Sequence, residues 1–375
     1  MIARTTIALA AVMLCYASQA NAGPLSASEM LQQFNVVVSG NLNSTSHVDG
    51  RTYVGGNVSG GDYVQHPGRT APSRYAGLTV GGNTGGNVKV NGLGAVVGGN
   101  ASGLTVNAGE SHVGGAASNA SFNGNVWVDG AASNVNFGQK IHAASYSGIN
   151  LNGKVLNATT ATMDATLAAS ASTDFGSVMG SLSSQLSALQ ATAGSSVLFS
   201  NNNQRVTFFG IPVDGLLVFD LTALDSKIFS ATTTDLSFRL NGASTVIFNT
   251  DDKTLNLAAN FDEARSLGSS LIWNFAGASS VSVGRSFGGQ VLVADGTFSN
   301  TGGANVEGGV YARNMNQYGE IHLQAFTGSL PAPAPESVAV PEPASLGLLL
   351  TGVGMMGFMR RRRKAAMAKG AGAAA

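Results

Sequence analysis

A short phrase recurs six times in the first part of the chain, and it constrains the fold more than any other feature. Successive copies begin at nearly equal intervals, and the single longer step, between Val54 and Val80, equals one repeat plus an insertion of ten residues. A constant period that keeps one apolar residue in register with turn glycines predicts short strands stacked as repeats. The copies read VSGN, VGGN, VGGN, VGGN, VGGA and VDGA, and they begin at Val38, Val54, Val80, Val97, Val113 and Val128.

This period predicts a mainly β fold, and specifically a β-solenoid, which is also called a parallel β-helix. Each valine is expected to point inward from a short strand that pairs with its copies about 4.8 Å above and below. We expect the glycines with Asn57, Asn83 and Asn100 to form the corners in the left-handed conformation, which Gly adopts freely and Asn tolerates. A disordered Gly/Asn/Ser segment does not explain why the valines keep register across six copies.

A different pattern follows in residues 158–193, which are rich in Ala, Ser and Leu. Apolar residues recur there at steps of three and four, which predicts one long or two tandem α-helices packed alongside the solenoid. From Val197 onward the strand pattern returns, and Val291, Val306 and Ile321 are evenly spaced at the interval of the earlier repeats. We therefore expect the last segments to stack onto or beside the first ones.

The start of the chain has the features of a secretory signal peptide. A basic residue precedes an apolar stretch, and Ala20 and Ala22 form a small-x-small cleavage site before Gly23. Residues 1–22 are therefore predicted to be removed by signal peptidase, which makes that enzyme an expected partner. Residues 23–329 are predicted to form the exported solenoid domain.

The C-terminal segment combines a proline-rich linker, residues 330–339, with an apparent membrane anchor at 340–364 and a short tail at 365–375. The apolar run of 16 residues makes a helix of about 24 Å, short of a 30 Å hydrocarbon core. We expect a transmembrane helix that holds the chain in the inner membrane only until it is cut, with the cations kept in the cytoplasm. The predicted sorting motif is Val340, Pro341, Glu342 and Pro343, and the predicted membrane stop is Arg360, Arg361, Arg362, Arg363 and Lys364.

The neutral total charge of the chain hides an acidic exported part. In residues 23–340, 13 basic residues face 19 acidic ones, a net charge of −6. Affinity for nucleic acid comes largely from Lys and Arg that neutralise phosphates, so no nucleic-acid partner is expected.

The patterns of catalytic and transition-metal sites are missing from the sequence. The five histidines are scattered and form no ligand set. The stretch GRSFG, Gly284–Gly288, matches a nucleophile elbow, but a strand pattern follows where the elbow requires a helix. We therefore predict no catalytic residue, no enzyme activity, no metal and no cofactor, with calcium at Asp-Gly corners as the exception to test. These corners, which ordinary turn chemistry also explains, are Asp49-Gly50, Asp129-Gly130 and Asp295-Gly296.

The insertion lies in residues 59–77, which concentrate side chains of the kind found in binding sites. Tyrosine rings stack on sugars, and arginine pairs with carboxylates in a fork. Our hypothesis is that this loop contacts an acidic surface polysaccharide, and a plain solvated loop is the commoner alternative. The candidate residues are Asp62, Tyr63, His66, Arg69, Arg74 and Tyr75.

Two parts of the chain resemble known families. Residues 340–364 resemble the PEP-CTERM sorting signal, which implies that an exosortase-type membrane protease cuts near the Pro-Glu-Pro motif. Residues 30–328 resemble the choice-of-anchor A family, a group regarded as surface adhesins with no established catalytic residues. This resemblance implies an ice-binding-like β-solenoid with a long helix beside it. The matching stretches are FNVVVSGN, HVDGRTYVGGN, LIWNF, NVEGGVYA and GEIHLQAFTG.

Together these features favour an exported bacterial protein of the cell surface or extracellular matrix. It is expected to be an adhesin or a structural protein associated with exopolysaccharide, because long regular faces suit repetitive ligands. One alternative is a polysaccharide-acting β-helix enzyme, which requires clustered carboxylates beside a general base. Another is an ice-binding protein, which requires a flat face with ladders of Thr-x-Thr or similar small residues.

Overall fold

The computed structural model describes residues 23–332, and residues up to Leu330 belong to one compact unit. The fold is mainly β, since 26 strands form one large sheet and four more form a second sheet. Strands of the large sheet pair in parallel with strands one repeat away in the sequence. Short segments of the chain thus stack on one another rather than forming hairpins.

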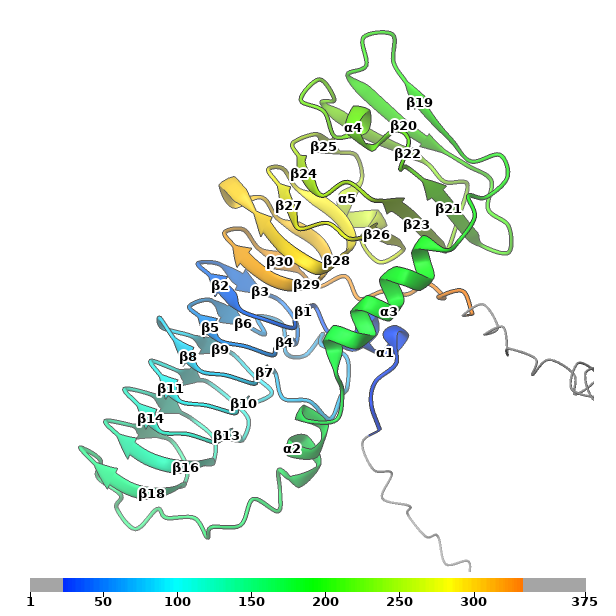
Figure 1. The fold of residues 1–375 in the computed structure, drawn as a ribbon. Coiled ribbons are helices and arrows are strands. Elements are labelled where there is room, and N and C mark those ends of the chain that lie inside the picture. The colour runs from blue at the N-terminus through cyan, green and yellow to red at the C-terminus, as the bar shows by residue number, and fades with distance from the viewer. Residues whose placement is uncertain (1–22, 333–375) are drawn as a thin grey trace, which may run out of the picture. The chain divides into compact units, whose positions relative to one another are not determined.

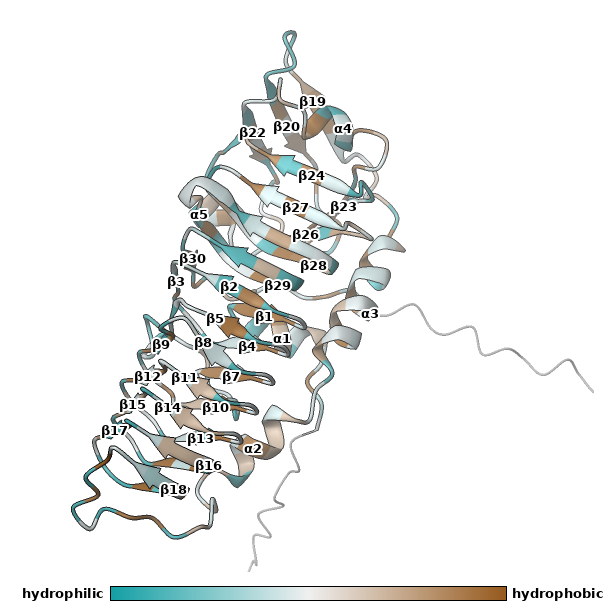
Figure 2. Cartoon of the chain, turned by 60° about the vertical axis from the view of Figure 1, so that its left-hand side comes forward, coloured by the Kyte–Doolittle hydropathy of each residue, from teal (hydrophilic) through white to brown (hydrophobic). Residues whose placement is uncertain are grey.

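The first half of the domain contains three columns of short strands, which lie next to one another in Figure 2. The first column consists of β1 (Val36–Val38), β4 (Thr52–Val54), β7 (Leu78–Val80), β10 (Ala95–Val97), β13 (Ser111–Val113), β16 (Val126–Ser133) and β18 (Ile141–Ser147). The second consists of β2 (Leu42–Ser44), β5 (Val58–Ser59), β8 (Thr84–Gly85), β11 (Ala101–Ser102), β14 (Ala117–Ser118) and the later parts of β16 and β18. The third consists of β3 (His47–Val48), β6 (Asp62–Tyr63), β9 (Lys89–Val90), β12 (Thr105–Val106), β15 (Ser121–Phe122) and β17 (Asn136–Phe137).

The recurring valines occupy one position of the first column, as the sequence predicts. Each pairs with the next, from Val38 to Val54 and so on to Val128. All six are at most 1 % exposed, so they point into the core between the columns. The extra residues of the insertion lie between β6 of the third column and β7 of the first column. They do not interrupt the stack, so Val54 pairs directly with Val80 despite the longer step.

The predicted left-handed corners are wrong. Neither the glycines that follow the valines nor Asn57, Asn83 and Asn100 have positive φ. Glycine is required at these corners because the backbone of the preceding repeat lies too close for a side chain. A Cβ on Gly82 would lie 2.6 Å from Oδ1 of Asn57 and 2.7 Å from the carbonyl oxygen of Gly56.

Two tandem helices follow the first half, so the two-helix alternative is correct. They are α2 (Asp164–Ser170) and α3 (Phe175–Ser187), and Asp174 caps α3 by accepting the N–H of Ser177 at 3.1 Å. Figure 1 shows α3 running along the side of the strands. Its apolar face, including Met179 and Leu186, is buried against outward-facing residues of the first column and its continuation. The structure also has the short helices α1 (Ala27–Gln33), α4 (Asp225–Ile228) and α5 (Ala264–Leu267).

After α3 the chain forms the far end of the stack and then returns toward its own start (Figure 1). The second sheet consists of β19 (Ser196–Phe199), β20 (Arg205–Phe209), β22 (Asp235–Arg239) and β25 (Asn260–Phe261). The returning strands of the large sheet are β21 (Leu216–Asp220), β23 (Thr245–Thr250), β24 (Thr254–Leu257), β26 (Leu271–Phe275), β27 (Ser280–Val283), β28 (Phe287–Asn300), β29 (Val306–Gln317) and β30 (Ile321–His322).

The last strands stack directly on the first ones, which confirms the expected return. Val310 of β29 pairs with Val36 of β1, and Ile321 of β30 pairs with Val48 of β3. In Figure 1 the orange C-terminal strands therefore lie beside the blue N-terminal strands. Residues from the two ends of the domain become neighbours at this junction, which is where the main charged site lies.

The expected repeat step from Val291 to Val306 is wrong. Val291 pairs with Val310 instead, further along the chain. A register shift within β28 and the 3₁₀ turn Thr301–Gly303 account for the extra length. The step from Val306 to Ile321 does follow the period of the earlier repeats, since these two residues are paired.

The predicted leader and the C-terminal anchor lie outside the described residues. This holds for the cleavage site at Ala20 and Ala22, for the sorting motif and for the predicted transmembrane helix with its basic cluster. Within residues 23–332, no helix is long and apolar enough to cross a membrane.

Candidate functional site

The outer side of the second column carries two parallel lines of exposed or half-exposed residues, which we call the polar face. Each repeat contributes one residue to each line, two positions apart, and eleven such rungs follow one another. The first line contains Thr254, Ser280, Thr297, Asn314, Asn41, Asn57, Asn83, Asn100, Ala116, Ala131 and Ser145. The second contains Asn256, Ser282, Ser299, Asn316, Asn43, Ser59, Gly85, Ser102, Ser118, Ser133 and Ser147.

None of these positions holds a charged or aromatic residue. Hydroxyl and amide groups both donate and accept hydrogen bonds, and strand spacing repeats them about every 4.8 Å along the stack. The asparagines also stabilise the stack itself, because Oδ1 of each corner asparagine accepts a backbone N–H of the next repeat at 2.8 Å. The polar face is thus regular and neutral, and hydrogen bonds between repeats hold the asparagines of its first line in place.

A second site lies at the junction between the returning strands and the first ones. It is a pocket of about 300 Å³, here called the charged pocket. Its walls bring together parts of the insertion, of α5, of β29 and of the segment after β30. The lining residues are Asp49, His66, Arg69, Arg265, Glu307, His322, Leu323 and Gln324.

His322 is the centre of the ionic contacts around this pocket. Its Nδ1 lies 2.7 Å from Oε1 of Glu307, and its Nε2 lies 2.7 Å from Oε2 of Glu320. A neutral imidazole has one N–H and can donate to only one of them, so these two contacts favour the doubly protonated ring. Burial alone lowers the pKa of His322, but the hydrogen bonds to Glu320 and Glu307 and the charges of Glu307 and Asp49 raise it above its ordinary value. The bond to His322 in turn lowers the pKa of Glu320, against a smaller opposing effect of burial.

The carboxylates of Asp49 and Glu307 are both satisfied within the protein. Oδ2 of Asp49 accepts the N–H of Leu323 at 3.1 Å, and Oδ1 lies 3.6 Å from Nε2 of His66. Glu307 receives His322 on one side and the guanidinium of Arg265 at 3.3 Å on the other. Each carboxylate side chain is only 8 % exposed, whereas the Arg265 side chain is 75 % exposed.

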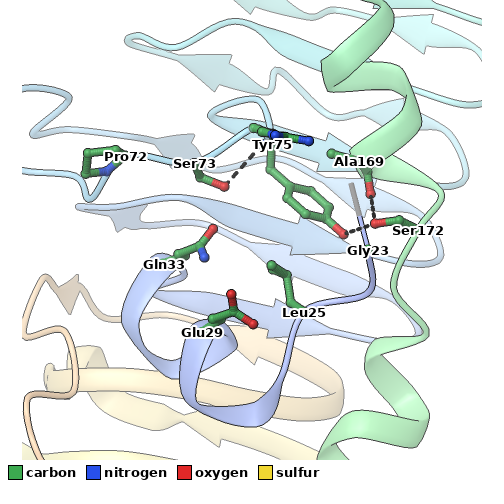
Figure 3. A pocket seen from close by; sticks show the side chains of 10 residues that line it. Gly23, Leu25, Glu29, Gln33, Pro72, Ser73, Tyr75, Ala169 and Ser172 are labelled. Atoms are coloured by element: carbon green, nitrogen blue, oxygen red, sulfur yellow. Dashed lines mark hydrogen bonds between the residues drawn. The ribbon is translucent and has the colours of Figure 1, made fainter. Parts of the chain in front are cut away.

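The insertion that the sequence singled out is divided between two surroundings. His66 and Arg69 are exposed and line the charged pocket, and Asp62 lies on the third column 3.7 Å from Lys89. Arg74 lines a separate pocket of about 480 Å³ beside α1, seen in Figure 3. The structure thus brings His66 and Arg69 together at one pocket and Arg74 and Tyr75 together at another, and it places Asp62 and Tyr63 elsewhere.

The expectation that the two tyrosines present their rings to a sugar is wrong for Tyr63, and Tyr75 is almost wholly covered although it lines the pocket beside α1. Tyr63 is fully buried, and its hydroxyl donates to the carbonyl of Gly60 at 2.9 Å. Tyr75 is 4 % exposed, and its hydroxyl donates to Oγ1 of Thr173 at 2.9 Å; Figure 3 shows the ring pointing toward the helical segment. Large aromatic rings supply burial area, and here the apolar core takes both of them.

Arg51 fixes the course of the insertion from within. It is 3 % exposed, and its guanidinium donates to four backbone carbonyls instead of a carboxylate. Desolvation lowers its pKa to about 10, so the group stays charged at neutral pH. The acceptors are the carbonyl oxygens of Gln33, Ala71, Tyr75 and Ala76.

The other sequence candidates have structural surroundings of their own. The side chain of Asp129 contacts His112 at 3.1 Å, and Asp295 lies exposed within β28. Across residues 23–332, no three His, Cys, Asp or Glu side chains form a group suited to hold a metal ion. Ser286 lies in the turn between β27 and β28, so a strand follows it, as predicted.

Sequence reasoning missed Arg265, Glu307, Glu320 and His322. They are spread over a helix, two strands and the turn between those strands, and they lie far from the insertion in the sequence, so no local motif marks them. The one available signal was the return of the repeat period in the last segments. It predicts that these segments stack onto or beside the first ones, but not which side chains meet there.

The fold and these sites define a class, a mainly β protein built from parallel stacked repeats with a long uncharged polar face. A family model described as a putative ice-binding-like adhesive domain matches residues 27–323, and the chain belongs to this family. A second model, the PEP-CTERM protein-sorting motif, matches residues 339–364. Comparison with the curated proteins and with the solved structures gives no match.

These matches confirm the two resemblances seen in the sequence, and the choice-of-anchor A assignment is compatible with them. The sorting motif marks the protein for export through the membrane to the cell surface or the extracellular space. It also implies recognition by an exosortase-type processing system. The protein is therefore an exported surface protein.

Proposed function

We propose that residues 23–329 form a β-solenoid that acts as a non-enzymatic adhesive module, or as a structural module associated with exopolysaccharide. The observation that carries this proposal is the polar face, with its eleven neutral rungs at strand spacing. A repetitive ligand such as a sugar chain can meet many rungs at once. Weak individual hydrogen bonds then combine through multivalency into lasting attachment.

A charge-insertion experiment tests this role of the polar face. The triple variant Ser59→Glu, Ser102→Glu and Ser118→Glu places negative charges on the central rungs, which repel an acidic chain and keep a flat ligand from close contact. We expect a much smaller fraction of this variant to stay with washed cells and matrix than of the wild type. The matched control is Thr105→Glu, Ser121→Glu and Asn136→Glu on the third column, which should be retained normally. Equal retention of the triple variant would refute the proposal.

The proposed maturation follows from the two sorting elements of the sequence. Signal peptidase removes residues 1–22, the apolar run holds the chain briefly in the inner membrane, and the exosortase-type protease cuts near Pro341-Glu342-Pro343. Intact-mass analysis of the native protein tests this order. The mature chain is expected to begin at Gly23 and to lack Arg360–Lys364, and a mature chain that keeps the basic cluster would contradict it.

The charged pocket favours one alternative, an enzyme that acts on polysaccharide. Its carboxylates, histidines and arginines are of the types that serve as general acids, bases and charge stabilisers. Chain cleavage of purified acidic polysaccharides by the protein would favour this alternative over a purely adhesive role.

The regular polar face is also relevant to ice binding, for which thermal hysteresis is the direct measurement. Few of its rungs carry threonine, so we expect little hysteresis.

A further inference from the structure

We infer that the charged pocket binds the carboxylate of an acidic sugar residue, such as a hexuronate unit of a polysaccharide. This inference deepens the proposed function, because it names the ligand class, and it rests on a surface other than the polar face. The sequence hypothesis placed this contact on the insertion alone. In the structure, Arg69 of the insertion and Arg265 of α5 line the same pocket, so we assign the contact to both of them.

The pocket presents cations to solvent while its own carboxylates are engaged. Asp49 and Glu307 form most of the buried wall, and each already accepts hydrogen bonds or ion pairs from the protein. Arg69, in contrast, is exposed, and its guanidinium has no hydrogen bond or ion pair among residues 23–332. A guanidinium matches the two oxygens of a carboxylate in a bidentate fork, which makes Arg69 the principal anion-binding group.

Arg265 supplies the second donor from the opposite part of the chain. Its contacts to Glu307 leave most of the side chain in solvent, so free N–H groups remain to face a ligand. These contacts also restrict the side chain, which lowers the entropy lost on binding. When protonated, His322 adds positive charge next to Glu307, which reduces repulsion between that carboxylate and an incoming anion.

The size and remaining walls of the pocket suit a sugar rather than a bare ion. A volume of about 300 Å³ lies at the lower end of the range for ligand pockets and far exceeds that of a carboxylate group. His66 and Gln324 line the same space and can hydrogen-bond to sugar hydroxyls. One acidic sugar residue held here would fix a long chain at a defined point of the domain.

Calorimetric titration of the full chain in a mild detergent tests the inference. The probes are tetragalacturonate and its methyl ester, which keeps the sugar rings and removes the charge. The wild type should bind the acid, with an affinity that falls as the salt concentration rises. It should bind the ester at least about tenfold more weakly, which is the size expected for losing one charge-assisted hydrogen bond. Arg69→Gln should weaken binding of the acid by about the same factor.

Arg285→Gln is the matched control, since Arg285 is also exposed and does not line the pocket. It should leave binding unchanged. Equal affinity of the wild type for acid and ester, or unaltered binding by Arg69→Gln, would overturn the inference, and so would no binding at all. Such results leave the polar face untouched, because retention of the glutamate variants on that face is measured separately.

Discussion

The side-chain oxygen of Asn57 accepts the backbone N–H of Asn83 at 2.8 Å, across one turn of the repeat. The same bond links Asn41 to Asn57, Asn83 to Asn100 and Asn100 to Ala116. Each asparagine thereby satisfies a corner N–H of the next repeat, because backbone donors need partners even where a strand ends. The repeats are joined at their corners as well as through their strands.

Replacing Asn57 by alanine should therefore destabilise the stack. The variant leaves the N–H of Asn83 to solvent and removes two hydrogen bonds, because Oδ1 of Asn57 also accepts Nδ2 of Asn83 at 3.1 Å, so we expect a loss of about 1–2 kcal/mol. Denaturant unfolding measures it. Asn136→Ala is the control, since Asn136 is exposed on β17 and makes no side-chain hydrogen bond among the described residues, and it should change stability by less than about 0.5 kcal/mol. Equal effects of the two substitutions would mean that the asparagine hydrogen bonds between repeats do not stabilise the stack.

The close approach at the corners predicts a sharp difference between two glycines of one repeat. A Cβ on Gly82 would overlap Asn57 and Gly56, whereas a Cβ on Gly85 would meet no heavy atom within 4 Å. Neither residue has positive φ, so backbone strain does not enter. Gly82→Ala should cost about 1–3 kcal/mol through overpacking, and Gly85→Ala should be close to neutral or slightly stabilising.

Thermal unfolding of the two variants checks this difference. A lower melting temperature for Gly82→Ala together with an unchanged one for Gly85→Ala is the expected result. If both glycines tolerated alanine equally, the repeats would have to sit further apart than the hydrogen bonds from Asn57 allow.

The repeat made much of the fold predictable. The valine period defined the inward position of the first column, and the similarity of the last segments to the first ones predicted the junction at β1 and β29. The reason for glycine at the corners was not predictable. It depends on the distance to the neighbouring repeat, whereas the sequence shows only that small residues are tolerated there.

The sites were less accessible to sequence reasoning. The sequence singled out His66 and Arg69 as candidate contact residues of the insertion, but it did not predict the charged pocket. Arg265 and His322 reach that pocket only because the chain returns to its start. Tyr75 was expected at the surface because sequence cannot distinguish an aromatic ring that faces solvent from one that faces a helix. The polar face consists of single residues from eleven repeats, and its regularity emerges only when the strands are in register.

Arg51 should be necessary for the ordered course of the insertion. Lysine keeps the charge but lacks the planar fork, so Arg51→Lys cannot satisfy the four carbonyls that the guanidinium reaches. We expect a loss of about 1–3 kcal/mol and faster proteolysis within residues 64–77. Arg285→Lys at an exposed turn is the control and should change neither property. Unaltered proteolysis of Arg51→Lys would show that the insertion is held by its other contacts.

The contacts of His322 predict how stability depends on pH. Its pKa is raised in the folded protein, so its contribution is complete below the ordinary value of 6.5 and is lost as pH rises through the folded value. The pKa of Glu320 is lowered, so its contribution is complete above the ordinary value of 4.5 and is lost as pH falls through the folded value. Stability from this cluster should therefore be greatest between pH 4.5 and 6.5.

The variant His322→Gln isolates the alkaline side of this profile. On the acid side, Glu29, Asp174 and Asp235 also have lowered pKa values through hydrogen bonds, so the decline there should persist in the variant. Above pH 6.5 the wild type should lose stability as His322 deprotonates, because the neutral ring can donate to only one of its two carboxylate partners. Melting temperatures measured from pH 5 to pH 9 should therefore fall for the wild type and stay nearly level for the variant. Parallel curves would mean that the pKa of His322 is the same in the folded and the unfolded protein.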